Sequence, residues 1–388
     1  MTMQAGGALR AGIIGTGFMG TVHSHAVRAS GGVVAAVASR SPEGTLAAAT
    51  RLGAAEACES PATLIARDDI DVVHICTPNA SHAELAASAI AAGKAVICEK
   101  PLATSVQDAA RLVSSAEAAG VVASVPFIYR FYPAVREIRE RILSGDAGRL
   151  WLLHGSYLQD WLADPRSNNW RVDPALGGGS RAFGDIGVHW CDLMEFVTGH
   201  RITRLVAKTS RAFPERPNGA RATRVETEDG ANLLFETDHG ASGSLVISQV
   251  TPGRKNRLWF SFDGTEKSFS FNQENPGTLR VGDTKSARHI PAGADMLTTD
   301  QGKKYAVLPA GHPQGYQDSF NAFVKDSYSA ISGEAVVGLP TFRDGLRAAQ
   351  LTESVLDSAA SGGWVSVPSI DDSATGIKPT ALINERSS

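Results

Sequence analysis

Acidic and imidazole side chains recur at one-turn spacing in the segment GGGSRAFGDIGVHWCDL, residues 177–193. Asp185 and His189 are four residues apart, and Asp192 follows three residues later. On a helix, residues at these spacings share one face. A histidine there can take the proton of a hydroxyl group while a neighbouring carboxylate orients the imidazole and shares its charge. We therefore expect proton transfer at His189, with Asp185 as its partner.

Two other interpretations of this segment remain open. The predicted helix, residues 181–198, is amphipathic, so the three polar residues could simply form an exposed face with a hydrogen-bonded histidine. A metal site is the other alternative, with Asp192 or a distant histidine as a further ligand. No cluster of cysteine or histidine supports it, and we expect no metal. In each case the glycines 177–179 supply a loop that lets backbone or substrate come close.

The first third of the chain alternates short apolar runs with alanine-rich helical stretches. This alternation is typical of right-handed β-α-β units around a parallel sheet. The second of two clear helices, residues 105–119, begins with a capping-box pattern, in which Thr104 precedes the helix and Gln107 lies in its first turn. We predict a doubly wound α/β domain, a Rossmann fold, over residues 1–128, with helices at 81–92 and 105–119 and strands at 9–14, 33–38, 71–76, 95–98 and 121–125.

A glycine motif follows the first predicted strand directly and opens a helix. In such a G-x-G-x-x-G motif, Gly15 permits a tight turn, Gly17 lets the backbone approach a pyrophosphate, and Gly20 lets the helix pack on the strand. The anion then lies at the helix N-terminus. Because strand, spacing and position agree, we predict a dinucleotide site that includes Gly15, Thr16, Gly17, Phe18, Met19 and Gly20.

The end of the second predicted strand bears on which dinucleotide binds. NAD sites usually place an acid there to hold the ribose hydroxyls. This chain has Ser39, Arg40 and Ser41 instead, with no carboxylate to repel a 2'-phosphate. Arg40 could pair with that phosphate, and the serines could donate hydrogen bonds to it. We favour NADP over NAD, and the alternative is that Arg40 is a solvated loop charge.

Two further segments come at strand ends, where ligands of such sheets bind. The first holds Thr77, Pro78 and Asn79, with His82 shortly after. Asn79 is as well suited to cap a helix as to contact a cofactor. The second segment is Glu99, Lys100 and Pro101. A lysine beside the cofactor can donate to a substrate oxygen and stabilise an alkoxide, whereas a surface lysine would simply pair with Glu99.

After about residue 127 the pattern changes to longer extended runs. Asp263-Gly264 and the segment 238–240 are turn signals between alternating segments. Three helices, at residues 181–198, 314–332 and 342–360, accompany the sheet. We predict an α+β domain over residues 129–368 with a large, open, mostly antiparallel sheet, and a polar tail over 369–388, with strands at 150–159, 202–209, 232–236, 242–250 and 258–262.

Composition excludes several classes of protein. The chain has 388 residues, a formal net charge of -3 and scattered Lys and Arg, so we expect no nucleic-acid or membrane partner. No apolar run reaches the roughly 18 residues of a membrane span, and the start of the chain lacks the pattern of a secretory leader. The four cysteines form no CxxC pair, which fits free thiols in a reducing cytoplasm.

Four motifs in order resemble the glucose-fructose oxidoreductase, inositol dehydrogenase and rhizopine catabolism (Gfo/Idh/MocA) family. They are GTGFMG, CTPN with His82, EKP, and GGG followed by D-x-G-x-H-x-x-D, and the resemblance spans about residues 9–367. It implies a Rossmann domain, a second domain whose open sheet often forms oligomer contacts, and thus a dimer or tetramer. It also implies Lys100 near the reacting hydroxyl, Asp185 as its helper and His189 as general base.

The same resemblance suggests further contacts with a substrate. Trp170-Arg171 and Tyr129-Arg130 match family positions near the site, whereas Ile128 departs from the polar residue that many members carry. The run YLQDW resembles that of levoglucosan dehydrogenase-type members, which act on pyranose sugars and tend to use NAD. By strand alternation its Tyr157, Gln159 and Trp161 would share one sheet face and offer hydrogen bonds and an apolar plane to a sugar ring. His312 in GHPQGY is a weaker candidate.

These observations together predict an NADP- or NAD-dependent oxidoreductase that interconverts a ring secondary alcohol and a ketone on a sugar, glycoside or cyclitol. Its substrate would be a small polyhydroxylated molecule. One alternative is a sensor of the same fold that binds dinucleotide without catalysis. Retention of Lys100, Asp185 and His189 favours an enzyme over that sensor. A second alternative is a reductase of a diol-derived or tetrapyrrole substrate, which would need a more apolar pocket than Gln159 and Asp160 suggest.

Overall fold

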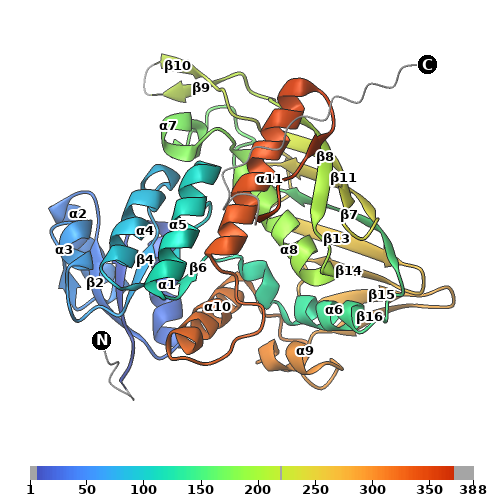
Figure 1. The fold of residues 1–388 in the computed structure, drawn as a ribbon, viewed down its shortest axis with the longest axis horizontal. Helices are drawn as coiled ribbons and strands as arrows, with labels where there is room; N and C mark the ends of the chain where they lie inside the picture. The colour runs from blue at the N-terminus through green and yellow to red at the C-terminus, as the bar shows by residue number, and fades with distance from the viewer. Residues whose placement is uncertain (1–6, 219–220, 371–388) are drawn as a thin grey trace.

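The computed structural model describes residues 7–218 and 221–370, and most of the predicted polar tail lies outside them. Two sheets organise the chain, one in each half (Figure 1). The N-terminal sheet is entirely parallel and has the strand order β3-β2-β1-β4-β5-β6, which is the order of the Rossmann fold. Its strands are β1 (Arg10–Ile14), β2 (Val33–Ala38), β3 (Glu56–Ala57), β4 (Val72–Ile75), β5 (Ala95–Cys98) and β6 (Ala123–Ser124).

The helices of this half connect successive strands, as the alternating sequence pattern predicts. Serine side chains cap three of them: Ser41 accepts a hydrogen bond from Gly44 N, Ser60 accepts one from Thr63 N and Ser105 accepts one from Asp108 N. The expected capping box of Thr104 and Gln107 is therefore wrong by one residue. The helices are α1 (Phe18–Ala29), α2 (Pro42–Leu52), α3 (Pro61–Ile65), α4 (His82–Ala91) and α5 (Val106–Ala119).

The second sheet is large, open and mostly antiparallel, as predicted. Its order is β16-β15-β14-β13-β7-β12-β11-β8-β17, and only β7 and β12 run parallel among the described residues. Turns follow Gly264 and Thr237, where the sequence signals placed them. Its strands are β7 (Leu150–Leu158), β8 (Ile202–Ser210), β11 (Gly230–Thr237), β12 (Ser242–Ser248), β13 (Arg257–Gly264), β14 (Ser268–Asn272), β15 (Thr278–Gly282), β16 (Ala287–Pro291) and β17 (Val365–Ser366).

Helices cover one face of the second sheet and separate it from the first (Figure 1). The proposed domain boundary falls in the short turn η2 (Ile128–Phe131). A separate pair of strands, β9 (Glu215–Asn218) and β10 (Arg221–Arg224), lies apart from both sheets. The helices of this half are α6 (Pro133–Leu143), α7 (Pro174–Gly177), α8 (Val188–Thr198), α9 (Asp300–Tyr305), α10 (Tyr316–Ile331) and α11 (Phe342–Ser361), of which α10 packs back against α1.

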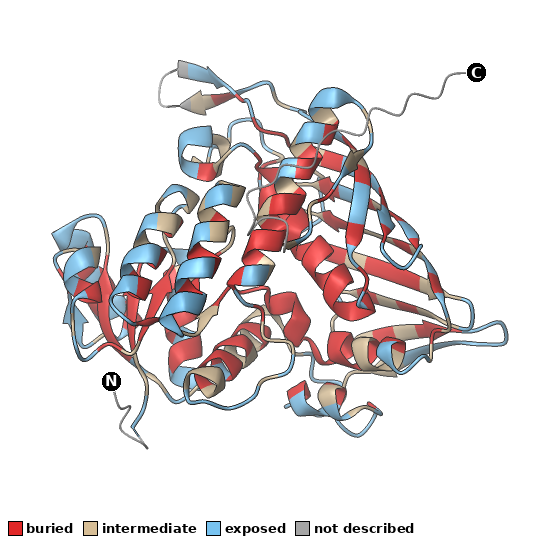
Figure 2. Cartoon of the chain, viewed as in Figure 1, coloured by how far each residue is buried: buried red, intermediate tan, exposed pale blue. Residues whose placement is uncertain are grey.

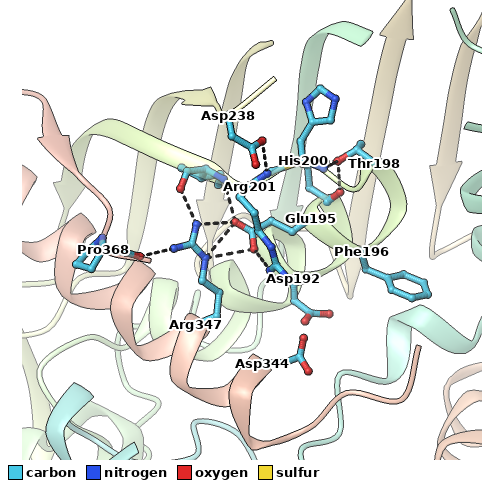
Figure 3. Close-up of polar contacts among 12 residues, drawn as sticks. Asp192, Glu195, Phe196, Thr198, His200, Arg201, Asp238, Asp344, Arg347 and Pro368 are labelled. Carbon is cyan, nitrogen blue, oxygen red and sulfur yellow. Dashed lines mark hydrogen bonds and ion pairs between the residues drawn. The ribbon is translucent and has the colours of Figure 1, made fainter. Parts of the chain in front are cut away.

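Helix α8 is buried along its whole length, which contradicts the expected amphipathic helix with an exposed polar face (Figure 2). Its acidic side chains are paired instead of solvated. The Arg347 guanidinium donates to Glu195 at 2.8 Å and also to the Pro368 carbonyl at 2.8 Å (Figure 3). One buried arginine thus ties α8, α11 and the last described segment together. No helix in the described ranges is long and apolar enough to cross a membrane.

Candidate active site

A cavity of about 1790 Å³ lies at the carboxyl ends of the parallel strands and extends to β7 and the start of α8. Pockets for a single drug-sized ligand measure roughly 300–1,000 Å³. This cavity therefore has room for a dinucleotide together with a small substrate. Ligands of doubly wound sheets bind at this edge, at the point where strands β2 and β3 lie on one side of β1 and strands β4 to β6 lie on the other.

The glycine motif forms one wall of this cavity and fits a pyrophosphate group. Gly15 has φ of +96°, and a Cβ there would lie 2.6 Å from the Cys76 carbonyl. A Cβ on Gly17 would meet no atom within 4 Å, so the backbone is open to a ligand. Gly20 does not line the cavity; its Cβ would lie 2.4 Å from the Gly15 carbonyl oxygen, so it serves helix packing. Helix α1 has no side-chain cap and no acid in its first turn, which leaves its N–H groups for an anion.

The segment after β2 lines the cavity with Ser39, Arg40 and Ser41. Both serines already have partners in the chain: the Ser39 hydroxyl lies 2.7 Å from the Thr45 hydroxyl, and Ser41 caps α2. Arg40 is exposed and makes no hydrogen bond or ion pair with any described residue. Of these three side chains, Arg40 is therefore the one that has no partner within the described ranges and can pair with a ligand.

The segment after β4 contributes Thr77, Pro78 and Asn79 to the cavity wall. The Asn79 side-chain amide donates at 2.8 Å to the carbonyl of Gly177, the last residue of α7, so it pairs the C-terminal carbonyl of that short helix and holds it against the segment after β4. His82 lies behind this wall, not in it, with its ring nitrogens 2.7 Å from the Pro101 carbonyl and 2.9 Å from the Thr77 carbonyl. It supports the loop from inside the protein.

Lys100, Asp185 and His189 meet at the inner end of the cavity. The Lys100 ammonium donates to Asp185 Oδ1 at 2.5 Å and to the Asp185 carbonyl at 2.9 Å. The other carboxylate oxygen accepts from Gln249 Nε2 at 2.7 Å, and Arg171 Nε lies 3.4 Å from Oδ1. Burial opposes ionisation, but Lys100 and Arg171 outweigh it and hold the pKa of Asp185 well below its ordinary value.

His189 is 8% exposed and lies edge-on to the rings of Tyr129 and Phe127, at centroid distances of 5.1 and 5.6 Å. Its Nδ1 is buried without a hydrogen-bond partner among the described residues, so Nε2 is the nitrogen available to the cavity. Burial and the Lys100 charge hold the pKa of His189 well below its ordinary value, and Asp185 only partly opposes them. The imidazole is therefore neutral at neutral pH and able to accept a proton.

A widened π-helical turn, Phe183–Gly187, carries Asp185 into α8. Single π turns inside helices are frequent at functional sites. The buried Glu228 carboxylate holds the start of this turn by accepting from the Ser180 hydroxyl at 2.7 Å and Phe183 N at 2.9 Å. Asp192 does not join the cavity; it pairs with Arg130, whose Nε lies 2.8 Å from Oδ2. Of the three polar residues of the predicted stripe, Asp185 and His189 therefore line the cavity, whereas Asp192 is buried in an ion pair with Arg130.

The opposite wall of the cavity carries polar and aromatic side chains from η2, from the end of β7 and the segment after it, from the short turn η3 (Trp170–Val172) and from the residue just before β13. Tyr129, Tyr157, Gln159 and Trp161 all line it, as do Trp170 and Arg171. Asn256 joins several of them: its Oδ1 accepts from the Tyr157 hydroxyl at 2.7 Å and from Gln159 Nε2 at 2.8 Å. Trp161 Nε1 donates to Gln159 Oε1 at 2.9 Å. This wall offers the hydrogen-bonding groups and flat apolar faces that a polyhydroxylated ring needs.

A buried chain of hydrogen bonds runs from the cavity wall into the protein. Glu99 Oε1 lies 3.1 Å from His23 Nε2, and His23 Nδ1 lies 2.8 Å from His74 Nδ1. His74 Nε2 lies 3.0 Å from the Tyr328 hydroxyl on α10. His23 thus holds the Glu99 carboxylate from inside the protein, and His74 and Tyr328 hold His23 in turn.

Three residues that the sequence predicted to bind cofactor or substrate do not reach the cavity. Gly20, His82 and the exposed His312 do not line it. Conversely, sequence reasoning missed residues that line the cavity or support its side chains, because they come from segments distant in the chain that only the folded topology brings together. Gln249 carried one usable signal, since its polar side chain falls near the end of the predicted strand 242–250. The missed residues are Gln249, Glu228, Lys255, Asn256 and Tyr316.

Comparisons with known proteins agree with this architecture. Residues 9–127 match a family model described as an oxidoreductase family with an NAD-binding Rossmann fold, and residues 135–270 match the GFO/IDH/MocA C-terminal domain. Levoglucosan dehydrogenase of Pseudarthrobacter phenanthrenivorans is 33% identical over 93% of this chain and 99% of its own length. The chain belongs to the Gfo/Idh/MocA family of oxidoreductases.

Other members of the Gfo/Idh/MocA family extend the comparison. Inositol 2-dehydrogenase 2 of Saccharopolyspora erythraea is 30% identical over 92% of this chain and 94% of its own length. A solved structure of levoglucosan dehydrogenase in complex with NADH and L-sorbose is 33% identical, with a TM-score of 0.87, and covers 93% of this chain and 99% of that one. This chain is accordingly an oxidoreductase of CH–OH groups with a Rossmann fold of the NAD-binding type.

Proposed function

We propose that this protein interconverts a ring secondary alcohol and its ketone on a sugar, glycoside or cyclitol. The observation that carries the proposal is the meeting of Lys100, Asp185 and His189 at the inner end of a cavity that begins at the glycine motif. A carbinol oxygen beside these groups would have a cation to stabilise its negative charge and a neutral imidazole to take its proton.

The proton and the hydride leave the carbinol by different routes. In oxidation, the hydroxyl proton passes to His189 Nε2 while the Lys100 ammonium donates a hydrogen bond to the oxygen as charge develops. A nicotinamide ring bound in the cavity would supply the acceptor for the hydride of the carbinol carbon in oxidation, and the donor of that hydride in reduction. Asp185 holds Lys100 in place and remains ionised, because its pKa lies well below the ordinary value. The carbonyl forms as the C–H and O–H bonds break.

The polar wall around Asn256 supports a sugar or cyclitol as the substrate class. Several hydrogen-bonding groups and the Trp161 and Trp170 rings line it together. Two relatives named above act, by their names, on levoglucosan and on inositol. A substrate with several hydroxyls would use the donors and acceptors that an apolar diol-derived or tetrapyrrole ligand would leave unpaired.

We propose NADP as the preferred dinucleotide. Arg40 supports this preference, since it lies at the cavity wall with no partner among the described side chains and no acid takes the usual ribose-binding position. The levoglucosan dehydrogenase structure, by contrast, holds NADH. We therefore expect this chain to differ from that relative in the contact with the adenosine ribose.

We also propose a homo-oligomer, a dimer or tetramer, assembled through the outward face of the second sheet. Leu234 and Val246 support it, because they are 54% and 44% exposed on the adjacent strands β11 and β12. Light scattering of the purified chain and of Leu234→Lys tests the assembly. A monomer in the unmodified chain would contradict it.

The test of the proposed function is an absorbance assay for reduced nicotinamide. Purified protein is mixed with a panel of pyranoses, glycosides and cyclitols, first with NADP and then with NAD. We expect turnover on a subset of ring alcohols, with a lower KM for NADP. Tight dinucleotide binding with no turnover on any substrate would contradict the proposal and favour a sensor of the same fold.

A further inference from the structure

Two histidines and an aspartate meet far from the cofactor cavity, at the turn between β11 and β12. His200 follows the end of α8, and Asp238 and His239 form the turn itself. One possible ligand atom from each residue lies within 4.8 Å of the other two. The two rings are 4.7 Å apart between centroids, with an interplanar angle of 38°. None of the three lines the cavity.

The hydrogen bonds of His200 fix which nitrogen is free. The Thr237 hydroxyl donates its one proton to the Ala241 carbonyl at 3.2 Å, so its oxygen accepts from His200 Nδ1 at 3.0 Å. His200 therefore carries its proton on Nδ1 and leaves the Nε2 lone pair unused. In Figure 3 the ring points away from the buried pair of Glu195 and Arg347.

The same logic applies to His239. A carboxylate only accepts hydrogen bonds, so the contact of 2.9 Å between His239 Nδ1 and Asp238 Oδ1 requires the proton on Nδ1. Oδ1 also accepts from Arg201 N at 2.8 Å, which holds the carboxylate in position. For His200 this is the arrangement that metal-binding histidines show, in which one nitrogen donates to an oxygen outside the site and the other is left for the metal.

We propose that His200, Asp238 and His239 form a zinc site that clamps the β11–β12 turn to the end of α8. Two imidazoles and one carboxylate suit Zn²⁺, whereas Mg²⁺ and Ca²⁺ prefer oxygen ligands alone. Zinc ligands lie about 3.3 Å from one another in a tetrahedron, as follows from bonds of 2.0–2.1 Å. Asp238 and His239 are exposed, so on binding the ion their side chains would rotate from the present spacing of up to 4.8 Å, exchange their mutual hydrogen bond for the shared metal, and leave the fourth position to water.

Calorimetric titration of the full chain with ZnCl₂ tests this site. The chain is made without a histidine tag and freed of metal with EDTA, and MgCl₂ serves as the comparison cation. We expect one equivalent of Zn²⁺ to bind at micromolar concentration or tighter, and MgCl₂ not to bind. His239→Gln should weaken Zn²⁺ binding at least tenfold, and so should Asp238→Asn, which keeps the acceptor for Arg201 N.

The matched control is His289→Gln, which removes an exposed histidine on β16 that makes no contact with the cluster. It should bind Zn²⁺ as the unmodified chain does. Zn²⁺ should also raise the Tm of the unmodified chain and of this control, and leave the Tm of His239→Gln unchanged, because a ligand stabilises only the state that binds it. Binding only at millimolar Zn²⁺, or equal binding by His239→Gln, would overturn the proposal.

Discussion

Lys100 Nζ lies 2.5 Å from Asp185 Oδ1 and 2.9 Å from the carbonyl oxygen of the same residue. One ammonium group thus donates hydrogen bonds to both the side chain and the backbone of the widened turn that leads into α8. The contact joins the Rossmann sheet to the helix that carries His189. Loss of either partner should therefore disturb the position of the acid–base group as well as the charge around it.

The pH dependence of oxidation should reveal the charges around His189. Burial and Lys100 lower the pKa of His189, and Asp185 raises it. As the pH is lowered, kcat/KM for alcohol oxidation should therefore stay constant past pH 6.5, the ordinary pKa of histidine, and fall only at a considerably lower pH. Lys100→Met should move this acid limb to higher pH, whereas Asp185→Asn should move it to lower pH. Shifts in the same direction in both variants would contradict His189 as the titrating base.

Asn256 should govern the affinity for substrate and not for cofactor. Its Oδ1 holds Tyr157 and Gln159 at the polar wall. Loss of these hydrogen bonds costs about 1–3 kcal/mol, so Asn256→Ala should raise the KM for the sugar roughly ten- to hundredfold. Steady-state kinetics with each ligand varied in turn measure the effect. Asn256→Asp keeps the acceptor and should recover part of the loss, and an equal rise in the cofactor KM would count against this assignment.

Arg40 should discriminate between the two dinucleotides. A hydrogen bond between charged groups contributes about 1.5–3 kcal/mol, so Arg40→Ala should raise the KM for NADP roughly ten- to hundredfold. The KM for NAD in the same variant is the internal control and should change little. If both KM values stay constant, Arg40 is a solvated loop charge, and this result would contradict the proposed contact between Arg40 and NADP.

Arg347 should matter for stability without entering the reaction. Its side chain is 7% exposed and pairs with the buried Glu195. Removing one partner of a buried pair leaves an uncompensated charge and costs about 3–5 kcal/mol. Urea unfolding of Arg347→Met should show a loss of this size, while Arg343→Met, in an exposed pair with Glu117, should lose less than about 1 kcal/mol. Equal losses would contradict the role given to the buried pair.

The Rossmann half is predictable because local signals agree there. The glycine motif, the apolar strands and the capped helices each report the same fold, and buried parallel strands read as continuous apolar runs. Strands β14 and β15 also alternate polar and apolar residues, and the turn signal at Asp263-Gly264 indicated an alternating segment after it, but no bounds were predicted for β14, β15 or β16. Helix α6 did carry a signal, since Val135, Ile138 and Ile142 recur at helical spacing behind Pro133.

The candidate site is less predictable, because its geometry depends on tertiary partners. Asp185 and His189 could be singled out from their spacing, and Lys100 from its place after a strand. Nothing in the local sequence tells that Arg130 pairs with Asp192, or that Glu228 holds the start of the widened turn. Such partners come from other strands and helices, and only the folded topology brings them within hydrogen-bond distance.

The central claim is that His189 is the proton acceptor in a dehydrogenase site. The most direct measurement compares the unmodified chain with His189→Ala for two quantities: dissociation constants of NADPH and NADH by fluorescence, and kcat on the best ring alcohol of the panel. We predict unchanged dinucleotide binding and a loss of kcat of roughly a hundred- to ten-thousandfold, the usual contribution of a positioned general base. Full turnover in His189→Ala would contradict the account.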